Sequence, residues 1–149
     1  MIIYLGADHR GFQLKEHVKG LLHNQGYETA DTGALKKEEG DDYPDFAKAV
    51  AERVAAEPNR DKGILFCGSG AGVDIVANKI PGVRSVLGFS TDQVYSARHD
   101  DDVNVLSIAA DFTDEAEIDN MVRVFMATPF SGEENHKRRL KKIASLEGN

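Results

Sequence analysis

The residues best placed to do chemistry are one cysteine and three glycines that follow it: Cys67, Gly68, Gly70 and Gly72. Glycines leave a turn without side chains, so successive backbone N–H groups can point into one concavity and bind an anion. A thiol beside such a turn, at the start of a helix, is favoured in its reactive thiolate form. A free cysteine is also often a small buried apolar residue. Position alone leaves both interpretations of Cys67 open.

The residues around this group predict a strand, a tight turn and a helix. The run Ile64 to Cys67 is apolar, and the apolar spacing of residues 73–80 is helical. A nucleotide phosphate loop would need Gly-Lys followed by Ser or Thr at the helix start, whereas Lys79 stands seven residues beyond Gly72. Val73 occupies the place where a dinucleotide fingerprint has Gly or Ala. Both nucleotide motifs are therefore disfavoured.

Composition limits the classes of protein that fit. The 149 residues suit one domain, 1–149, which would bury roughly 68–70% of its unfolded surface without disulfides. The sequence shows no signal-type segment and no apolar run near the ~18 residues of a membrane span, so we expect a cytoplasmic protein without a membrane partner. The net charge of −7 disfavours a nucleic-acid partner. A basic cluster near the C-terminus could bind one anion or be the solvated face of a helix: Lys137, Arg138, Arg139, Lys141 and Lys142.

Five short apolar strands alternate with helical patterns. We predict strands at residues 2–6, 27–31, 64–67, 83–89 and 104–109. Six helices are predicted. The first ends near residue 24, the second begins at Pro44, and the third follows the glycine turn. The fourth runs from a cap at Ser90 through Arg98, the fifth follows a cap at Thr113, and the sixth begins at 132–134. This alternation predicts a doubly wound, Rossmann-like α/β domain, in which a five-stranded parallel sheet is covered by helices on both faces.

In such a sheet ligands bind beyond the carboxyl ends of the strands, where the strand order reverses. With the order 2-1-3-4-5 that point lies between the first and third strands, so Asp8 and His9 would meet the turn at 67–73. A carboxylate, an imidazole, a thiol and an anion-binding turn would face one crevice, which favours the functional interpretation of Cys67. Asp8 could instead cap a helix, and His9 could be a surface loop residue.

Three motifs stand in order along nearly the whole chain. They are Gly6-Ala7-Asp8-His9-Arg10-Gly11-Phe12-Gln13-Leu14-Lys15, then Asp31-Thr32-Gly33 with Asp42-Tyr43-Pro44, then Cys67-Gly68-Ser69-Gly70 through Asn78-Lys79. On these motifs the sequence resembles the type B ribose-5-phosphate isomerases and the related galactose-6-phosphate isomerase subunits. The resemblance implies interconversion of ribose 5-phosphate and ribulose 5-phosphate, in pentose phosphate metabolism, without metal or other cofactor. It also implies a homodimer or dimer of dimers with shared active sites, the C-terminal helix (about 132–147) packing on a partner subunit.

The resemblance further implies roles for individual residues. Cys67 would be the base, Ser69 would assist proton movement between substrate oxygens, and His99 would open the sugar ring. The substrate-binding residues implied are Asp8, His9, Tyr43, Gly68, Gly70, Ala71, Gly72, Val73, Asp100, Asp101 and Arg139. The chemistry agrees, because the reaction needs a base for the C2 proton and N–H donors for the enediolate oxygen.

Two departures from the family pattern affect specific roles. Asn135 stands where the family has a phosphate-binding arginine, so Arg139 alone matches there. The segment before the fifth strand differs by one residue, so that either His99 keeps the ring-opening position or Asp100 replaces it. The rival functions are isomerisation of another aldose phosphate such as allose or galactose 6-phosphate, a catalytically silent sugar-phosphate-binding protein, and a cysteine hydrolase.

Overall fold

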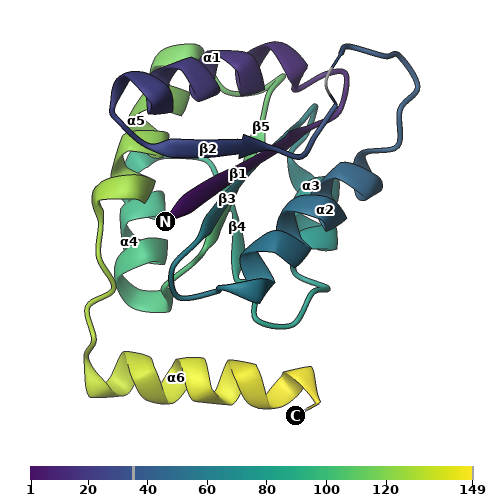
Figure 1. Ribbon diagram of the computed structural model, residues 1–149. Coiled ribbons are helices and arrows are strands. Elements are labelled where there is room, and N and C mark those ends of the chain that lie inside the picture. Colours follow the sequence, from purple (N-terminus) through teal and green to yellow (C-terminus); the bar gives the residue numbers. More distant parts are fainter. Residues whose placement is uncertain (35, 149) are drawn as a thin grey trace.

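The fold is an alternation of strands and helices in a computed structural model that describes residues 1–34 and 36–148 (Figure 1). The strands are β1 (Ile2–Ala7), β2 (Glu28–Asp31), β3 (Lys62–Cys67), β4 (Ser85–Gly88) and β5 (Val105–Ala109). The helices are α1 (Phe12–Asn24), α2 (Tyr43–Ala56), α3 (Ala71–Ala77), α4 (Thr91–Asp101), α5 (Glu115–Ala127) and α6 (Glu134–Ala144), which a 3-10 turn, Ser145–Glu147, extends. Within the described residues, no helix combines the length and apolar character that a bilayer crossing requires.

The five strands form one parallel sheet in the order β2-β1-β3-β5-β4. The predicted doubly wound α/β class is confirmed, but the predicted order 2-1-3-4-5 is wrong in its last two places. Strand β5 is buried along its whole length and lies inside the sheet, whereas β4 has four residues, three of them partly exposed, and lies at the edge. Short, partly exposed strands suit an edge. The point at which the strand order reverses still lies between β1 and β3.

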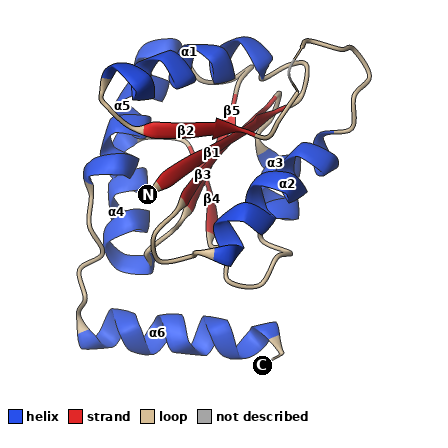
Figure 2. Cartoon of the chain, viewed as in Figure 1, coloured by secondary structure: helices blue, strands red, loops and turns tan. Residues whose placement is uncertain are grey.

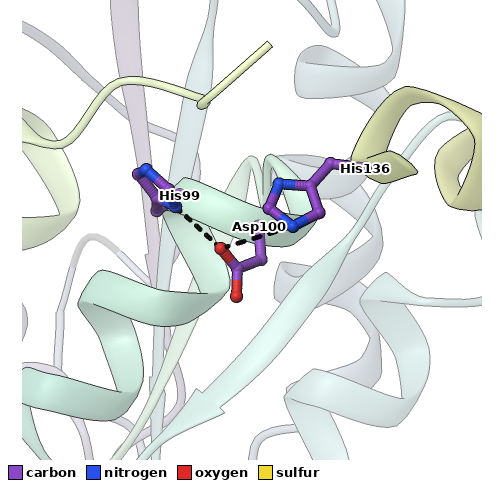
Figure 3. A group of neighbouring side chains, drawn as sticks. All are labelled: His99, Asp100 and His136. Carbon is purple, nitrogen blue, oxygen red and sulfur yellow. Dashed lines mark hydrogen bonds and ion pairs between the residues drawn. The ribbon is translucent and has the colours of Figure 1, made fainter. Parts of the chain in front are cut away.

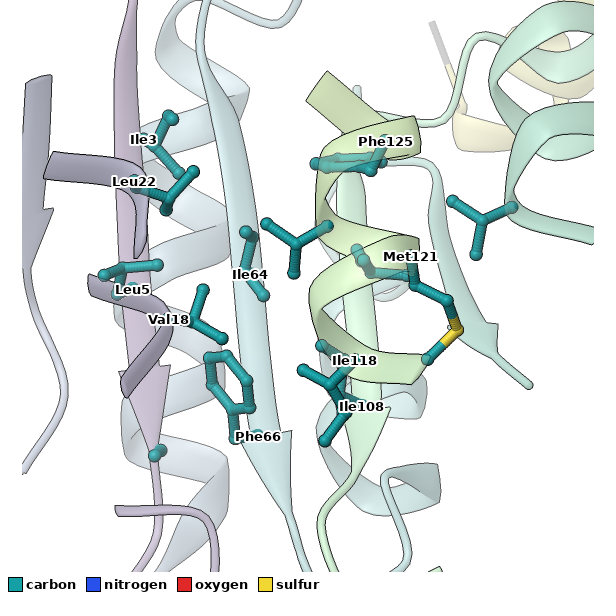
Figure 4. Packing of buried hydrophobic residues seen from close by; sticks show 14 of the residues in the cluster. Ile3, Leu5, Val18, Leu22, Ile64, Phe66, Ile108, Ile118, Met121 and Phe125 are labelled. Carbon is teal, nitrogen blue, oxygen red and sulfur yellow. The ribbon is translucent and has the colours of Figure 1, made fainter. Parts of the chain in front are cut away.

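Helices cover both faces of the sheet, with α1, α4 and α5 on one side and α2 and α3 on the other (Figure 2). The alternation of strand side chains assigns each residue of β3 to one layer. Ile64 and Phe66 pack with α1 and α5, as Figure 4 shows, while Leu65 and Cys67 pack with α2 and α3. The thiol of Cys67 therefore lies on the α2–α3 face, at the carboxyl end of the central strand.

A buried lysine anchors the loop after β2. Lys15 is fully buried, and its Nζ donates to Asp31 Oδ2 at 2.6 Å and to the Ala34 carbonyl at 2.7 Å. Burial alone would raise the pKa of Asp31, but hydrogen bonds from Lys15 and Lys19 outweigh that effect and hold it below its ordinary value. Gly33 passes so close to β1 that a Cβ there would lie 2.7 Å from the Ala7 nitrogen. The loop is thereby held over the carboxyl end of β1.

The end of α4 and the start of α5 differ slightly from the prediction. Helix α4 was expected to end at Arg98 and instead reaches Asp101, and Asp102 closes it in the left-handed conformation with φ 46°. The N-terminal cap of α5 is at Asp114 rather than Thr113. Helix α6 begins at Glu134, within the predicted range of 132–134, after a left-handed Gly132.

Helix α6 lies apart from the two helical layers (Figure 1). At one end the Ser131 N–H donates to the His99 carbonyl at 2.9 Å, and at the other the Gly82 N–H donates to the Glu147 carboxylate at 3.1 Å. Ile143 and Leu146 remain 42% and 85% exposed. They line a cavity of about 480 Å³ between α6 and the amino end of the sheet, together with Val83, Val86 and Val103. Much of the apolar surface of α6 is therefore left uncovered within the chain.

Candidate active site

The turn after β3 binds the sulfur of Cys67 with its own backbone. Gly70 donates its N–H to Cys67 Sγ at 3.1 Å, and Cys67 is 4% exposed. Gly70 adopts the left-handed conformation, φ 72° and ψ −21°, and is the N-cap of α3. The Ala71 N–H points back to Ser69 Oγ at 3.4 Å. Both interpretations of Cys67 thus have a structural counterpart, because the thiol is buried and also receives an N–H donor that stabilises negative charge on sulfur.

Two of the three glycines of the turn, Gly70 and Gly72, are required by close packing. A Cβ on Gly70 would overlap Leu87 and lie 2.9 Å from the Ala109 nitrogen. A Cβ on Gly72 would lie 2.6 Å from the ring of Tyr43. Larger residues at these positions would push the turn away from the end of the sheet. The contact with Gly72 also places Tyr43, at the start of α2, beside the turn.

Asp8 and His9 follow β1, the strand next to β3. Asp8 is 5% exposed, and its Oδ1 accepts the N–H groups of Arg10 and Gly11, each at 2.9 Å. These bonds hold the loop before α1, whose N-cap is Gly11 without a side-chain cap, so Asp8 does not cap the helix as the alternative from the sequence supposed. They leave the second carboxylate oxygen, Oδ2, for a ligand. The Asp8 N–H also donates to the Phe66 carbonyl at 3.3 Å, which joins the two loops.

His9 is oriented by a residue that the sequence did not single out. Its Nδ1 lies 2.7 Å from Asp41 Oδ1, and the same oxygen accepts the His9 backbone N–H at 3.1 Å. The other oxygen of Asp41 is buried without a hydrogen-bond partner in the part of the chain that the structure describes. Asp41 is one of four acidic residues in the segment 38–42, so composition gave no reason to prefer it.

Arg10 is a second residue that the sequence analysis missed. Its guanidinium covers Gly68, where an added Cβ would overlap it, and it pairs with the carboxylate of Asp111 beyond β5. The charge of Arg10 therefore lies against the backbone of the glycine turn. The pairing could not be foreseen, because the two residues are 101 positions apart.

A second group of polar side chains joins the end of α4 to the start of α6 (Figure 3). His99 Nδ1 lies 2.7 Å from Asp100 Oδ1, and His136 Nε2 lies 3.8 Å from the same oxygen. The hydrogen bond from His99 lowers the pKa of Asp100, with smaller contributions from the charges of His136 and Arg139. His99 and Asp100 both lie near the end of α4 and bond to each other, so the assignment of the ring-opening position to one of them stays a prediction.

This second group and Cys67 lie at opposite ends of the sheet. Arg84, just before β4, donates to the carbonyls of Asp101 and Asp102, which places the end of α4 at the amino ends of the strands. Cys67 ends β3, and that strand of six residues spans about 17 Å. Within one chain the structure therefore brings Asp8, His9, Tyr43 and residues 67–73 together. It does not bring His99, Asp100, Asp101 or Arg139 to them.

A model of the ribose/galactose isomerase family matches residues 3–143. The chain belongs to this family. Ribose-5-phosphate isomerase B of Mycobacterium tuberculosis is 39% identical over 147 residues, which are 99% of this chain and 90% of the relative. The structure of ribose-5-phosphate isomerase B from Mycoplasma genitalium with bound ribulose-5-phosphate has a TM-score of 0.95 at 36% identity, covering 98% and 95% of the two chains. The Clostridium thermocellum enzyme gives 0.93 at 33% identity, with coverages of 99% and 97%.

The ribose/galactose isomerase family was the one expected from the three sequence motifs, and that expectation is confirmed. Cys67, Ser69 and Asp8 occupy the end of the sheet at which a doubly wound domain binds ligands. The roles of the individual residues remain predictions.

Proposed function

We propose that the protein interconverts ribose 5-phosphate and ribulose 5-phosphate, with Cys67 as the base and no metal in the reaction. The observation that carries the proposal is the thiol of Cys67 held by the Gly70 N–H in a glycine turn at the switch point of the sheet. Membership of the ribose/galactose isomerase family supports it, as does the relative from Mycoplasma genitalium that binds ribulose-5-phosphate.

The chemistry assigns one step to each group of the turn. Cys67 as a thiolate removes the proton on C2 of the open-chain aldose and returns it to C1, while the hydroxyl proton on O2 moves to O1 with the help of Ser69. The enediolate between these steps carries negative charge on oxygen. Backbone N–H groups from Ser69 to Val73 stabilise that charge, because they are already oriented when it develops.

The remaining residues of the carboxyl end bind substrate in this proposal. The free oxygen of Asp8 accepts a sugar hydroxyl, and Tyr43 borders the pocket at Gly72. His9, held by Asp41, and Arg139 bind the phosphate, to which an arginine can donate two parallel hydrogen bonds. The protein would act in the cytoplasm, where a lone thiol stays reduced.

We further propose a homodimer in which each site combines two chains. His99 and Arg139 lie at the opposite end of the sheet from Cys67, so they can reach the thiol only from another subunit. The exposed Ile143 and Leu146 and the adjoining apolar cavity offer a surface for that subunit to cover. This arrangement would place the C-terminal helix against the partner.

The first test is proton exchange in deuterated water over a panel of four- to six-carbon aldose phosphates. We expect deuterium to enter the product carbon with ribose 5-phosphate as the preferred substrate, and the rate to be unchanged by chelator. Faster exchange with allose or galactose 6-phosphate would assign a different substrate. Binding without any exchange would make the protein a silent sugar-phosphate binder.

The second test mixes two inactive variants, Cys67→Ala and His99→Ala, by refolding them together. With random pairing, half of the dimers are mixed and each has one intact site, so about a quarter of wild-type activity should return. Mass spectrometry of the intact dimers checks that mixing occurred. Mixed dimers without activity would show that each site is built within a single chain.

A further inference from the structure

His99, Asp100 and His136 present three metal-ligand atoms to one point (Figure 3). The ligand atoms lie within 4.8 Å of one another, with Asp100 Oδ1 between the two rings. Two imidazoles and a carboxylate bound to Zn²⁺ at about 2.0–2.2 Å would be roughly 3.3 Å apart. Shifts of about 1 Å in these side chains would therefore bring all three to a single ion.

Neighbouring side chains hold the two histidines in fixed orientations, as is common for metal ligands. Ser131 Oγ lies 2.7 Å from His136 Nδ1, so an N–H on that nitrogen leaves the Nε2 lone pair facing Asp100. Metal-binding histidines are commonly oriented by such a second hydrogen bond. His99 is stacked on Tyr95, one turn earlier on α4, with ring centroids 5.5 Å apart. His136 is 10% exposed and His99 33%, so an ion can enter from the side of His99.

We propose that His99, Asp100 and His136 form a binding site for Zn²⁺ or a similar divalent transition metal ion. Imidazole nitrogens with one carboxylate suit zinc, whereas Mg²⁺ and Ca²⁺ prefer all-oxygen sites. The fourth position of a tetrahedral ion is left for water. A proton on His99 Nδ1 would leave to solvent when the metal binds. The positive charge of Arg139 nearby opposes the ion, which makes the site one for reversible binding rather than a permanent structural metal.

Occupation of this site would inhibit the isomerase, a consequence that rests on the proposed function. Zinc would hold the ring of His99 and prevent it from moving protons on a cyclic sugar. The ion would also join the end of α4 to the start of α6, two segments that the structure links by the hydrogen bond from Ser131 N–H to the His99 carbonyl. Binding should therefore raise the thermal midpoint of the full-length protein.

The test is calorimetric titration of zinc chloride into chelator-treated protein. We expect one ion per chain, and Asp100→Asn or His136→Gln should weaken binding at least about tenfold, because each removes a ligand. Asp100→Asn is at an exposed helix end and should fold normally. His17→Gln is the matched control, since His17 also bonds a carboxylate, Asp119 at 2.7 Å, but belongs to a group with one imidazole. It should bind zinc as the wild type does.

Thiols also bind zinc, so the same titration is run on Cys67→Ala. Unchanged affinity in Cys67→Ala with loss in Asp100→Asn supports the proposed site. Loss in Cys67→Ala with full affinity in Asp100→Asn overturns it, as does an absence of binding in the wild type. Calorimetry measures zinc affinity directly, so it tests the metal site even if the protein proves to lack isomerase activity. If it is an isomerase, zinc should slow ribose 5-phosphate turnover and chelator should restore it.

Discussion

The two ends of the sheet are built by different means. At the carboxyl end the main chain determines the site, since Gly70 and Gly72 permit a turn that packs closely against Leu87, the backbone at Ala109 and the ring of Tyr43. At the amino end, side chains on the termini of α4 and α6 determine it, through His99, Asp100 and His136. A site made by backbone packing is fixed by the fold of one chain. A site made by partly exposed side chains on two helix ends can be completed by a partner or a ligand.

The largest effect should come from Cys67→Ala at the carboxyl end. Removing the base should slow C2 proton exchange by about 10²–10⁴-fold, while the deletion of one buried sulfur should cost only about 1 kcal/mol of stability. Exchange is measured by NMR in deuterated water, and binding of ribulose 5-phosphate by calorimetry. Binding should survive, because the thiol acts mainly in the transition state. An alanine variant with full activity would remove Cys67 from the mechanism.

Gly70→Ala tests whether backbone packing fixes this end. Alanine at φ 72° costs about 1 kcal/mol for conformation, and the overlap with Leu87 and the Ala109 nitrogen adds about 1–3 kcal/mol. The variant should therefore lose about 3 kcal/mol in urea denaturation. Gly26→Ala is the matched control, with φ 81° and no heavy atom within 4 Å of the added Cβ in the described structure. Equal losses in both variants would mean that packing at the turn contributes nothing.

His99→Asn tests the amino end through substrate choice. If His99 opens the sugar ring, the variant should slow turnover of cyclic ribose 5-phosphate by about 10²-fold, the usual contribution of a proton-transfer group. A tetrose 4-phosphate cannot close that ring, so its turnover should change by less than about threefold. Steady-state kinetics on both substrates give the comparison. Equal losses would reject the ring-opening role, and the same selectivity in Asp100→Asn instead would transfer it to Asp100.

The sequence predicted the carboxyl end better than the amino end, for a physical reason. Glycine spacing and the end of an apolar strand are local signals, so the turn at 67–73 and its place beside Asp8 follow from them. The order of β4 and β5 depends on which strand is more deeply buried, a property of the whole sheet. His136 and Arg10 could not be assigned contacts, because His99 and Asp111 are brought to them only by the folded chain.

Lys62 offers the smallest and most specific test of the amino end. It begins β3, with its Nζ 5.8 Å from the centre of the Phe125 ring, and burial lowers its pKa to about 8, helped by the positive charge of Arg98. A pKa below the ordinary 10.5 means that the folded protein binds this proton more weakly than the unfolded chain. The charged Lys62 therefore lowers the free energy of unfolding by its full amount below pH 8. The loss shrinks as the pH rises from 8 to 10.5 and is absent above that range.

Lys62→Met should remove this loss and stabilise the protein by about 1–2 kcal/mol at pH 7, a figure reduced from the full pKa shift because the amine is partly solvated. Urea denaturation at pH 7 and pH 10 should show the advantage of the variant falling with pH. Lys48→Met, on the exposed face of α2, should show no such change. A constant difference between Lys62→Met and wild type across this range would mean that folding leaves the pKa of Lys62 unchanged, so that burial does not disfavour its charge.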